Sequence, residues 1–230
     1  MKIAVFGTGS VGQTLAAKLS ELGHEVFMGT RNVAEKASST TKDHYGNPSF
    51  SEWYRDNGSV RLVTFEEAAV SGELLINATR GDNSIEILKL AGQRNLENKI
   101  LIDISNPLDF SKGMPPTLLP GLSNTNSLGE EIQKAFPGTK VVKTFNTMWC
   151  GLMVNPGMLG GGDHINFISG NDQAAKVIVI TLLEQIGWKN GNILDLGDIT
   201  AARATEGYLL LWVRIMTVSK SSAFNFKIIT

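Results

Sequence analysis

Three glycines near the start of the chain have the spacing of a phosphate-binding turn. Residues 7–12 read Gly-Thr-Gly-Ser-Val-Gly, which fits the pattern G-x-G-x-x-G. In such a turn the first glycine allows a tight bend, the second lets the backbone approach a pyrophosphate, and the third lets a helix pack closely on a strand. The pyrophosphate lies on the helix N-terminus, where N–H groups and the helix dipole favour anions. The spacing therefore predicts a dinucleotide site formed by Gly7, Thr8, Gly9, Ser10, Val11 and Gly12.

The residues after the second strand-like segment indicate which dinucleotide binds. An acidic residue at this point commonly bonds the ribose 2′-hydroxyl of NAD. Here the segment 25–29 is followed by Thr-Arg-Asn, and Glu25 stands at its start, too early to reach the ribose. A guanidinium fork suits a phosphate, and a lysine one helical turn later adds a second positive charge. We therefore expect NADP, held near its 2′-phosphate by Thr30, Arg31, Asn32 and Lys36.

Strand-like and helix-like segments alternate along most of the chain. Strands are expected at residues 3–6, 25–29, 60–65, 74–79, 99–105 and 141–145, with helical segments between them. This alternation predicts a Rossmann-type, doubly wound α/β fold whose mostly parallel sheet is covered on both faces. We assign residues 1–148 to an NADP-binding Rossmann domain and residues 149–230 to a small C-terminal α/β domain that packs on it.

Two segments depart from simple alternation. Residues 38–59 are polar and turn-rich with one short helix expected at 50–56, which predicts either a functional loop or a mobile excursion. The chain also ends in a long helix, from about residue 199 to 219, that is apolar nearly all round. Such a helix must be buried, within the subunit or against a partner. We expect a homodimer that uses Leu209, Leu211, Trp212, Ile215 and Met216.

The ends of the parallel strands are the places where ligands of open α/β sheets bind. This rule places six residues along the cofactor: Ala78, Thr79, Asn106, Pro107, Asn146 and Thr147. Asn106 and Asn146 could bond the nicotinamide half, although asparagines before Pro or Thr also suit turns. Met148 and Trp149 could form an apolar wall for a planar substrate ring, or they could belong to the core.

Hydride transfer between two cofactor-like rings needs no general base from the protein, and we assign no catalytic residue. Reduction of a ketone or imine usually does need a positioned acid, for which Asp103 and Glu206 are the candidates. Both have a structural explanation. Asp103 lies in an Ile-Asp-Ile strand and could be held by backbone N–H groups, and Glu206 follows Arg203 by three residues, the spacing of an ion pair on a helix face.

Composition excludes several classes of protein. The chain has 230 residues with 21 basic and 22 acidic side chains, a net charge of -1, and no block of like charge, so a nucleic-acid partner is not expected. A single cysteine, Cys150, and three scattered histidines exclude a disulfide framework and predict no metal site. No apolar run approaches the roughly 18 residues of a membrane span, and the N-terminus lacks signal-peptide features. We therefore expect a cytoplasmic protein.

Several motifs together resemble the NADPH-dependent coenzyme F420 reductases. They are residues 7–12, 23–26 and 29–31 near the start, Lys-Val-Val-Lys-Thr-Phe-Asn-Thr at 140–147, and residues 169–172, 187–188, 195–197 and 202–203. The resemblance implies a Rossmann-type domain and hydride exchange between NADP(H) and a deazaflavin. The same module is similar to the cytosolic domain of the six-transmembrane metalloreductases, in which a flavin accepts the hydride. The chain departs from the family in its polar fourth-strand ending at 77–81 and in the 38–59 loop.

The leading hypothesis is thus an NADP-dependent oxidoreductase that exchanges a hydride with a small molecule, coenzyme F420 or a flavin. One alternative is an NADPH-dependent reductase of a small carbonyl or imine, with Glu206 or Asp103 as the acid and Arg80 as the plausible substrate clamp. Another is a non-catalytic NADP(H)-binding sensor.

Overall fold

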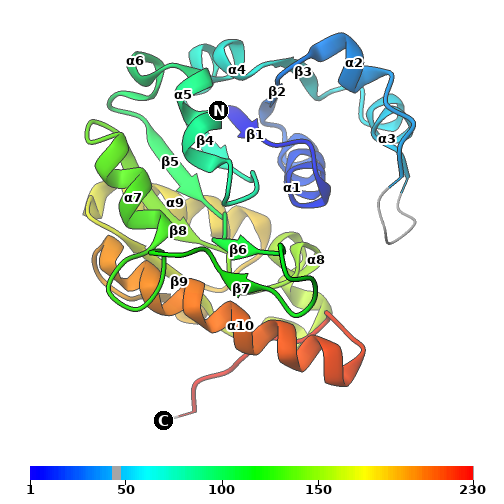
Figure 1. Ribbon diagram of the computed structural model, residues 1–230. Coiled ribbons are helices and arrows are strands. Elements are labelled where there is room, and N and C mark those ends of the chain that lie inside the picture. Colours follow the sequence, from blue (N-terminus) through cyan, green and yellow to red (C-terminus); the bar gives the residue numbers. More distant parts are fainter. Residues whose placement is uncertain (43–47, 230) are drawn as a thin grey trace.

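The computed structural model describes residues 1–42 and 48–229, and one sheet runs through its centre (Figure 1). Its eight strands are β1 (Lys2–Phe6), β2 (Glu25–Thr30), β3 (Arg61–Thr64), β4 (Leu74–Asn77), β5 (Ile100–Asp103), β8 (Lys140–Thr144), β9 (Asn166–Gly170) and β10 (Ile193–Asp195). They lie in the order β10-β9-β8-β5-β4-β1-β2-β3, and every neighbouring pair is parallel except β8 with β9. Six neighbouring strands of the sheet, in the order β3-β2-β1-β4-β5-β8, have the arrangement of a doubly wound dinucleotide-binding fold. The expected fold class is therefore confirmed.

Helices cover both faces of the sheet because the strands bury alternate side chains on opposite sides. In β1, Ile3 and Val5 belong to one core and Ala4 and Phe6 to the other. The first core is covered by α1 (Ser10–Glu21), α8 (Cys150–Val154) and α9 (Gln173–Ile186). The second is covered by α4 (Phe65–Ser71), α5 (Ser84–Ala91), α6 (Gln93–Leu96), α7 (Leu128–Ala135) and the start of α10 (Ala202–Ser219).

The strands after residue 148 extend the sheet that the earlier strands build. β9 pairs with β8, and β10 pairs with β9. Short 3₁₀ turns connect this region: η1 (Pro156–Met158), η2 (Gly160–Gly162), η3 (Asn190–Asn192) and η4 (Ile199–Ala201). The two parts of the chain therefore share one sheet, and the domain division at residue 148 stays a prediction.

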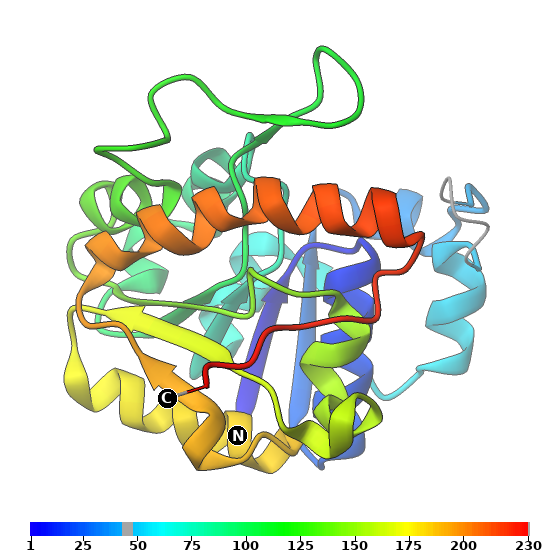
Figure 2. The same cartoon turned by 90° about the horizontal axis from the view of Figure 1, so that it is seen from below.

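The long helix α10 is covered in part by the chain itself, which is one of the two ways of burial expected for it. The segment 220–229 turns back along α10 (Figure 2). Its Phe224 ring stacks on Trp212 with centroids 5.4 Å apart, and its Phe226 backbone carbonyl accepts a hydrogen bond of 2.8 Å from the amide of Ile165. Leu211 is still 52% exposed. A homodimer through α10 stays a prediction.

The polar segment 38–59 contains the expected helix, α3 (Phe50–Asp56), which follows the short helix α2 (Val33–Ala37). Ser49 caps α3, because its hydroxyl accepts from the Glu52 amide while the Glu52 carboxylate accepts from the Ser49 amide. The part of this loop at 43–47 lies outside the described residues. Among the helices of the described chain, none has the length and apolar character needed to cross a membrane.

A second, two-stranded sheet was not expected from the sequence. β6 (Leu108–Asp109) pairs antiparallel with β7 (Thr117–Leu118), directly after the carboxyl end of β5. We call residues 107–119 the arm. Pro107 and Pro116 are buried, whereas residues 110–115 are exposed. Figure 2 shows the arm, in green, projecting from the body of the protein beyond α10.

Candidate cofactor-binding site

The glycine turn between β1 and α1 has the geometry that its spacing predicts. Gly7 has a φ of +115°, and a Cβ there would lie 2.5 Å from the carbonyl oxygen of Ala78. A Cβ on Gly12 would lie 2.1 Å from the carbonyl oxygen of Gly7, so the helix can pack this closely only without a side chain. A Cβ on Gly9, in contrast, would meet nothing within 4 Å. The open space in front of Gly9 is where a pyrophosphate would approach the backbone.

The N-terminus of α1 suits an anion. Its N-cap is Gly9, which provides no side-chain cap, and its first turn contains no acidic residue. The turn is fixed from behind, since the Gln13 side-chain amide donates a hydrogen bond of 2.9 Å to the carbonyl of Thr8. A helix start of this kind directs N–H groups and the positive end of the dipole at a ligand.

A cavity of about 770 Å³, which we call the main cavity, opens in front of this turn. It lies where the strand order reverses, between the carboxyl ends of β1 and β4. Nine of the predicted cofactor residues line it: Gly7, Thr8, Gly9, Thr30, Arg31, Asn32, Lys36, Ala78 and Thr79. The hydroxyl-rich residues 38–41 line it too, so the first part of the unusual loop faces the cavity. A volume in the range of 300–1,000 Å³ is typical of sites for small molecules and cofactors.

Positive charge gathers at the end of the main cavity beyond β2. Arg31 is exposed and has no hydrogen bond or ion pair to another described residue. The Lys36 ammonium lies 4.7 Å from the centre of the Phe50 ring, and burial lowers the pKa of this lysine. Asn32 caps α2 by accepting from the Glu35 amide at 3.1 Å. Glu25 pairs with Arg61 at the opposite end of β2, which agrees with the expectation that it does not reach a ribose.

A smaller cavity of about 180 Å³, which we call the side cavity, adjoins the main one. The two share Ala78, Thr79 and Arg80. The other lining residues of the side cavity come from α1, the turn after β4, the segment after β5 and the arm: Val11, Gly81, Ile104, Ser105, Asn106, Leu108 and Phe110. A dinucleotide whose 2′-phosphate end lies near Arg31 would therefore direct its other end toward Asn106 and the arm.

The two asparagines predicted to bond the nicotinamide bond each other. Asn106 Nδ2 donates to the Asn146 carbonyl at 2.9 Å, and Asn146 Nδ2 donates to Asn106 Oδ1 at 3.0 Å. Asn146 is 2% exposed and lines neither cavity; in this structure it orients Asn106, and its own contact with the cofactor stays a prediction. Four other predicted residues, Ser10, Gly12, Pro107 and Thr147, also line neither cavity, and their contact with the cofactor stays a prediction.

Of the two roles left open for Met148, the structure favours the core over an apolar wall for the substrate, whereas the wall role of Trp149 stays a prediction. Met148 is 5% exposed and belongs to the core on the α1 side of the sheet. The Trp149 ring lies over the backbone of Gly151, since a Cβ on that glycine would be 2.4 Å from the ring. Neither residue lines a cavity found in the described part of the chain. The apolar residues that do line the side cavity include Leu108 and Phe110 of the arm, together with Val11, Ala78 and Ile104.

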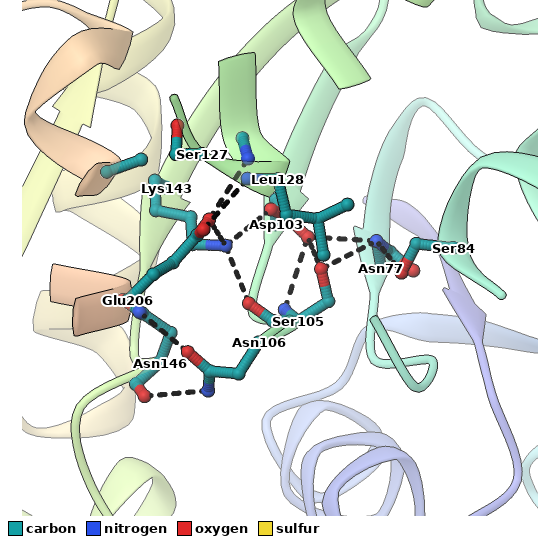
Figure 3. Close-up of polar contacts among 12 residues, drawn as sticks. Asn77, Ser84, Asp103, Ser105, Asn106, Ser127, Leu128, Lys143, Asn146 and Glu206 are labelled. Atoms are coloured by element: carbon teal, nitrogen blue, oxygen red, sulfur yellow. Dashed lines mark hydrogen bonds and ion pairs between the residues drawn. The ribbon is translucent and has the colours of Figure 1, made fainter. Parts of the chain in front are cut away.

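Three polar side chains lie side by side at the carboxyl ends of β4, β5 and β8 (Figure 3). Asn77, Asp103 and Lys143 are neighbours in register, and Glu206 joins them from α10. Lys143 Nζ donates to Asp103 Oδ2 at 2.7 Å and to Glu206 Oε1 at 2.8 Å. Its third contact is the Ser105 carbonyl at 2.6 Å. All three ammonium hydrogens therefore have an acceptor.

The two carboxylates of this cluster also accept hydrogen bonds from other groups. Glu206 accepts from the amides of Leu128 and Gly129 at 2.8 and 3.0 Å, at the N-terminus of α7. Asp103 accepts from the Asn77 amide at 2.8 Å and from the Ser105 hydroxyl at 2.6 Å. Although desolvation opposes the charged form, the two carboxylates raise the pKa of Lys143 above its ordinary value. Salt-bridged charges of this kind hold the strand ends that line the cavities.

These contacts decide what Asp103 and Glu206 can do. Both are at most 1% exposed, and neither lines a cavity in the described chain, so no route from them to a substrate is seen. The expected ion pair of Glu206 with Arg203 is wrong, because Arg203 instead binds Glu130 with Nε at 2.8 Å. Asp103 is held mainly by side chains, with one backbone contact from Ser105 at 3.2 Å. Both carboxylates are structural.

The remaining candidates for chemistry are inert in this structure. Burial raises the pKa of the Cys150 thiol, although Thr14 donates a hydrogen bond to its sulfur at 3.7 Å. A neutral, half-buried thiol is a poor nucleophile. No group of three or more potential metal ligands occurs among the described residues.

Comparison with known proteins places the chain among nicotinamide-dependent reductases. The model of the family described as "NADP oxidoreductase coenzyme F420-dependent" matches residues 2–107. A crystal structure from Arthrobacter sp. FB24, whose protein carries the provisional name F420-dependent NADP reductase, is 51% identical and covers the whole of both chains with a TM-score of 0.93.

More distant relatives share parts of this arrangement. The chain is 29% identical over 208 residues to Metalloreductase STEAP3 of Rattus norvegicus, a match that covers 89% of this chain and 36% of that protein. The chain thus spans well under half the length of this curated relative. A solved imine reductase of Streptomyces aurantiacus is 18% identical, with a TM-score of 0.63 over 95% of this chain and 64% of that one, and shows the same fold.

Proposed function

The chain belongs to the family of coenzyme F420-dependent NADP oxidoreductases, and from that premise we propose that it transfers a hydride between NADP(H) and a deazaflavin or flavin ring. Membership makes the chain an NADP-dependent oxidoreductase. The identity of the hydride acceptor is the part that we propose.

The observation that carries the proposal is that the two cavities adjoin, with Ala78, Thr79 and Arg80 lining both. The main cavity begins at the cationic pair Arg31 and Lys36, passes the open backbone of Gly9, and meets the side cavity at Thr79. An extended dinucleotide with a 2′-phosphate matches this order of cation, anion-binding turn and smaller pocket. Its reactive end would lie in the side cavity beside Asn106.

The reaction needs no protonatable side chain at this end. NADPH gives up one hydride, which carries two electrons, to a carbon or nitrogen of the acceptor ring, and one proton from water completes the reduced ring. The products are NADP⁺ and the two-electron-reduced acceptor, and the reverse direction balances in the same way. The residues of the chain orient the two rings and exclude water. Asp103 and Glu206 are ion-paired with Lys143, which agrees with a reaction in which no carboxylate of the chain transfers a proton.

A reductase of small carbonyls or imines is the second candidate, favoured by the fold shared with imine reductases. Such a reaction usually needs an acid next to the substrate. Both acids that the sequence offered are buried within the Lys143 cluster, and Arg80, the plausible clamp, is paired with Asp82 at 2.7 Å. These contacts favour the flavin-like acceptor over this alternative.

The test is the loss of NADPH absorbance with purified protein and a panel of acceptors. The panel contains the deazaflavin, FMN and FAD on one side, and keto acids, aldehydes and cyclic imines on the other. We expect faster oxidation with the first group. A Gly9→Val variant, purified in the same way, measures the background from contaminating reductases, because a side chain at Gly9 projects into the main cavity. Robust turnover of a small carbonyl with none for any flavin-like ring would promote the second candidate. Tight NADPH binding without turnover would instead indicate a sensor.

A further inference from the structure

We infer that the arm, residues 107–119, is the wall against which the hydride acceptor binds, with Phe110 under its planar ring. The inference rests on the proposed function and names the residues that give it an acceptor site. At the turn 147–149, where the sequence suggested an apolar wall, Met148 is in the core and the Trp149 ring packs on Gly151.

The position of Phe110 is the first argument. Its side chain lines the side cavity, yet the residue is 46% exposed. Part of an aromatic side chain thus faces the pocket expected to hold the nicotinamide, and much of the rest faces solvent. An exposed aromatic surface beside a cofactor pocket is what a second planar ring would cover.

The size of the side cavity is the second argument. Its volume of about 180 Å³ is below the roughly 300–1,000 Å³ of pockets that enclose whole small-molecule ligands. It suits the single-ring end of a dinucleotide and leaves no room for a tricyclic acceptor as well. The acceptor must therefore lie at the mouth of this cavity. The arm supplies two lining residues there, Leu108 and Phe110.

The local structure of the arm holds Phe110 in place. The amide of Gly113 donates to the Phe110 carbonyl at 2.9 Å, and Gly113 has a φ of +84°, so residues 110–113 form a tight turn directly after β6. The base is fixed by a backbone hydrogen bond of 2.8 Å from Leu119 to Pro107. Beyond Phe110, Met114 is 60% exposed and gives the arm a second apolar contact.

The ligand class follows from these contacts. The surface that the arm presents is aromatic and aliphatic, since Leu108 and Phe110 line the side cavity. It fits a planar heteroaromatic ring, which is the shared chemistry of deazaflavin and flavin cofactors. A small keto acid would use little of this apolar area. A second copy of the chain seated on the arm is the competing occupant, and the experiment separates the two.

The experiment compares the wild-type protein with Phe110→Ala, Phe110→Tyr, Met114→Ala and a matched control, Met158→Ala. Met158 is 51% exposed and lines neither cavity. For each we would measure the KM of FMN and of the deazaflavin, the Kd of NADPH by fluorescence, and the mass in solution by light scattering. We expect Phe110→Ala to raise the acceptor KM about tenfold, with the NADPH Kd changed less than twofold. Phe110→Tyr should restore the wild-type KM, and Met158→Ala should have no effect.

Each other result counts against the inference in a distinct way. If the wild-type protein reduces flavin-like rings and Phe110→Ala leaves the acceptor KM unchanged, the arm is not the acceptor wall and the proposed function stands. If the wild-type protein reduces no such ring, the proposed function fails and the inference with it. If Phe110→Ala or Met114→Ala changes the mass in solution and not the KM, the arm is a contact between copies of the chain.

Discussion

Lys143 Nζ lies 2.8 Å from Glu206 Oε1, and this ion pair joins strand β8 to helix α10 inside the protein. Both side chains are at most 1% exposed. Glu206 in turn accepts hydrogen bonds from the backbone amides of Leu128 and Gly129, the first two residues of α7. A residue that the sequence suggested as an acid is therefore the link between three elements that support the cofactor end of the sheet.

Replacement of Lys143 by methionine should destabilise the protein strongly. The change leaves Asp103 and Glu206 buried beside each other without their counter-charge, which costs about 3–5 kcal/mol. Urea denaturation gives the free energy of unfolding. The matched control is Lys89→Met, which breaks the exposed pair of Lys89 with Glu86 and should cost at most about 1 kcal/mol. Similar small losses in both variants would show that the buried cluster is not a structural link.

Arg31→Ala should separate the two nicotinamide cofactors. Loss of a charge-assisted bond to the 2′-phosphate costs about 1.5–3 kcal/mol, which is roughly 10- to 100-fold in the Kd of NADPH. The Kd of NADH, which has no such phosphate, should hardly change. Isothermal titration measures both constants, and Arg94→Ala, an exposed arginine away from both cavities, is the control. Equal losses for NADPH and NADH would contradict the placement of the 2′-phosphate beside Arg31.

Gly9→Ala should weaken NADPH binding, whereas Gly12→Ala should lower the stability of the fold. The methyl group on Gly9 enters open space, so the unfolding free energy should stay within about 1 kcal/mol of wild type while NADPH binding weakens at least about tenfold. The methyl group on Gly12 would meet the Gly7 carbonyl at 2.1 Å, which should cost about 1–3 kcal/mol of stability. Thermal denaturation and NADPH titration of both variants test this contrast. A Gly9→Ala protein that binds NADPH normally would show that the pyrophosphate does not approach this turn.

A homodimer through α10 predicts a mass in solution of twice the chain. Leu211 is 52% exposed on this helix, and Leu211→Glu would place a charge in such an interface. Light scattering at micromolar concentration should show a dimer for wild type and a monomer for this variant. Leu90→Glu, at a leucine 56% exposed on α5, should remain dimeric. A monomeric wild-type protein would rule out the dimer.

The sequence predicts most of the fold because its signals are local. Apolar runs mark the buried strands, and the glycine spacing places the turn before α1. The helix at Phe50–Asp56 carries its own capping signal in Ser49 and Glu52, and it appears where expected. These features depend on residues a few positions apart, which is the range in which pattern and propensity act.

What the sequence did not predict depends on contacts between distant residues. The strands of the arm have two residues each, too short to show a period. The strand-end rule brings Asn146 to the correct edge but does not say that it turns back onto Asn106. The ion pair of Lys143 with Asp103 could have been predicted from the sequence. A lysine in one buried strand and an aspartate in another imply such a pair, because charged side chains are rarely buried alone. The Phe224 ring that covers Trp212 lies in the C-terminal segment 220–229. That segment has no hydrophobic periodicity from which its position could have been predicted.

The most direct test of the central claim follows the hydrogen itself. NADPH carrying deuterium at both C4 positions would be mixed with the oxidised deazaflavin and the protein, and the reduced deazaflavin analysed by mass spectrometry and NMR. If the two rings meet at the side cavity, the hydride passes directly and the product retains one deuterium at the ring carbon. A reduced product without deuterium, or no reduced product while NADPH binds normally, would contradict direct transfer from NADPH to a flavin-like ring.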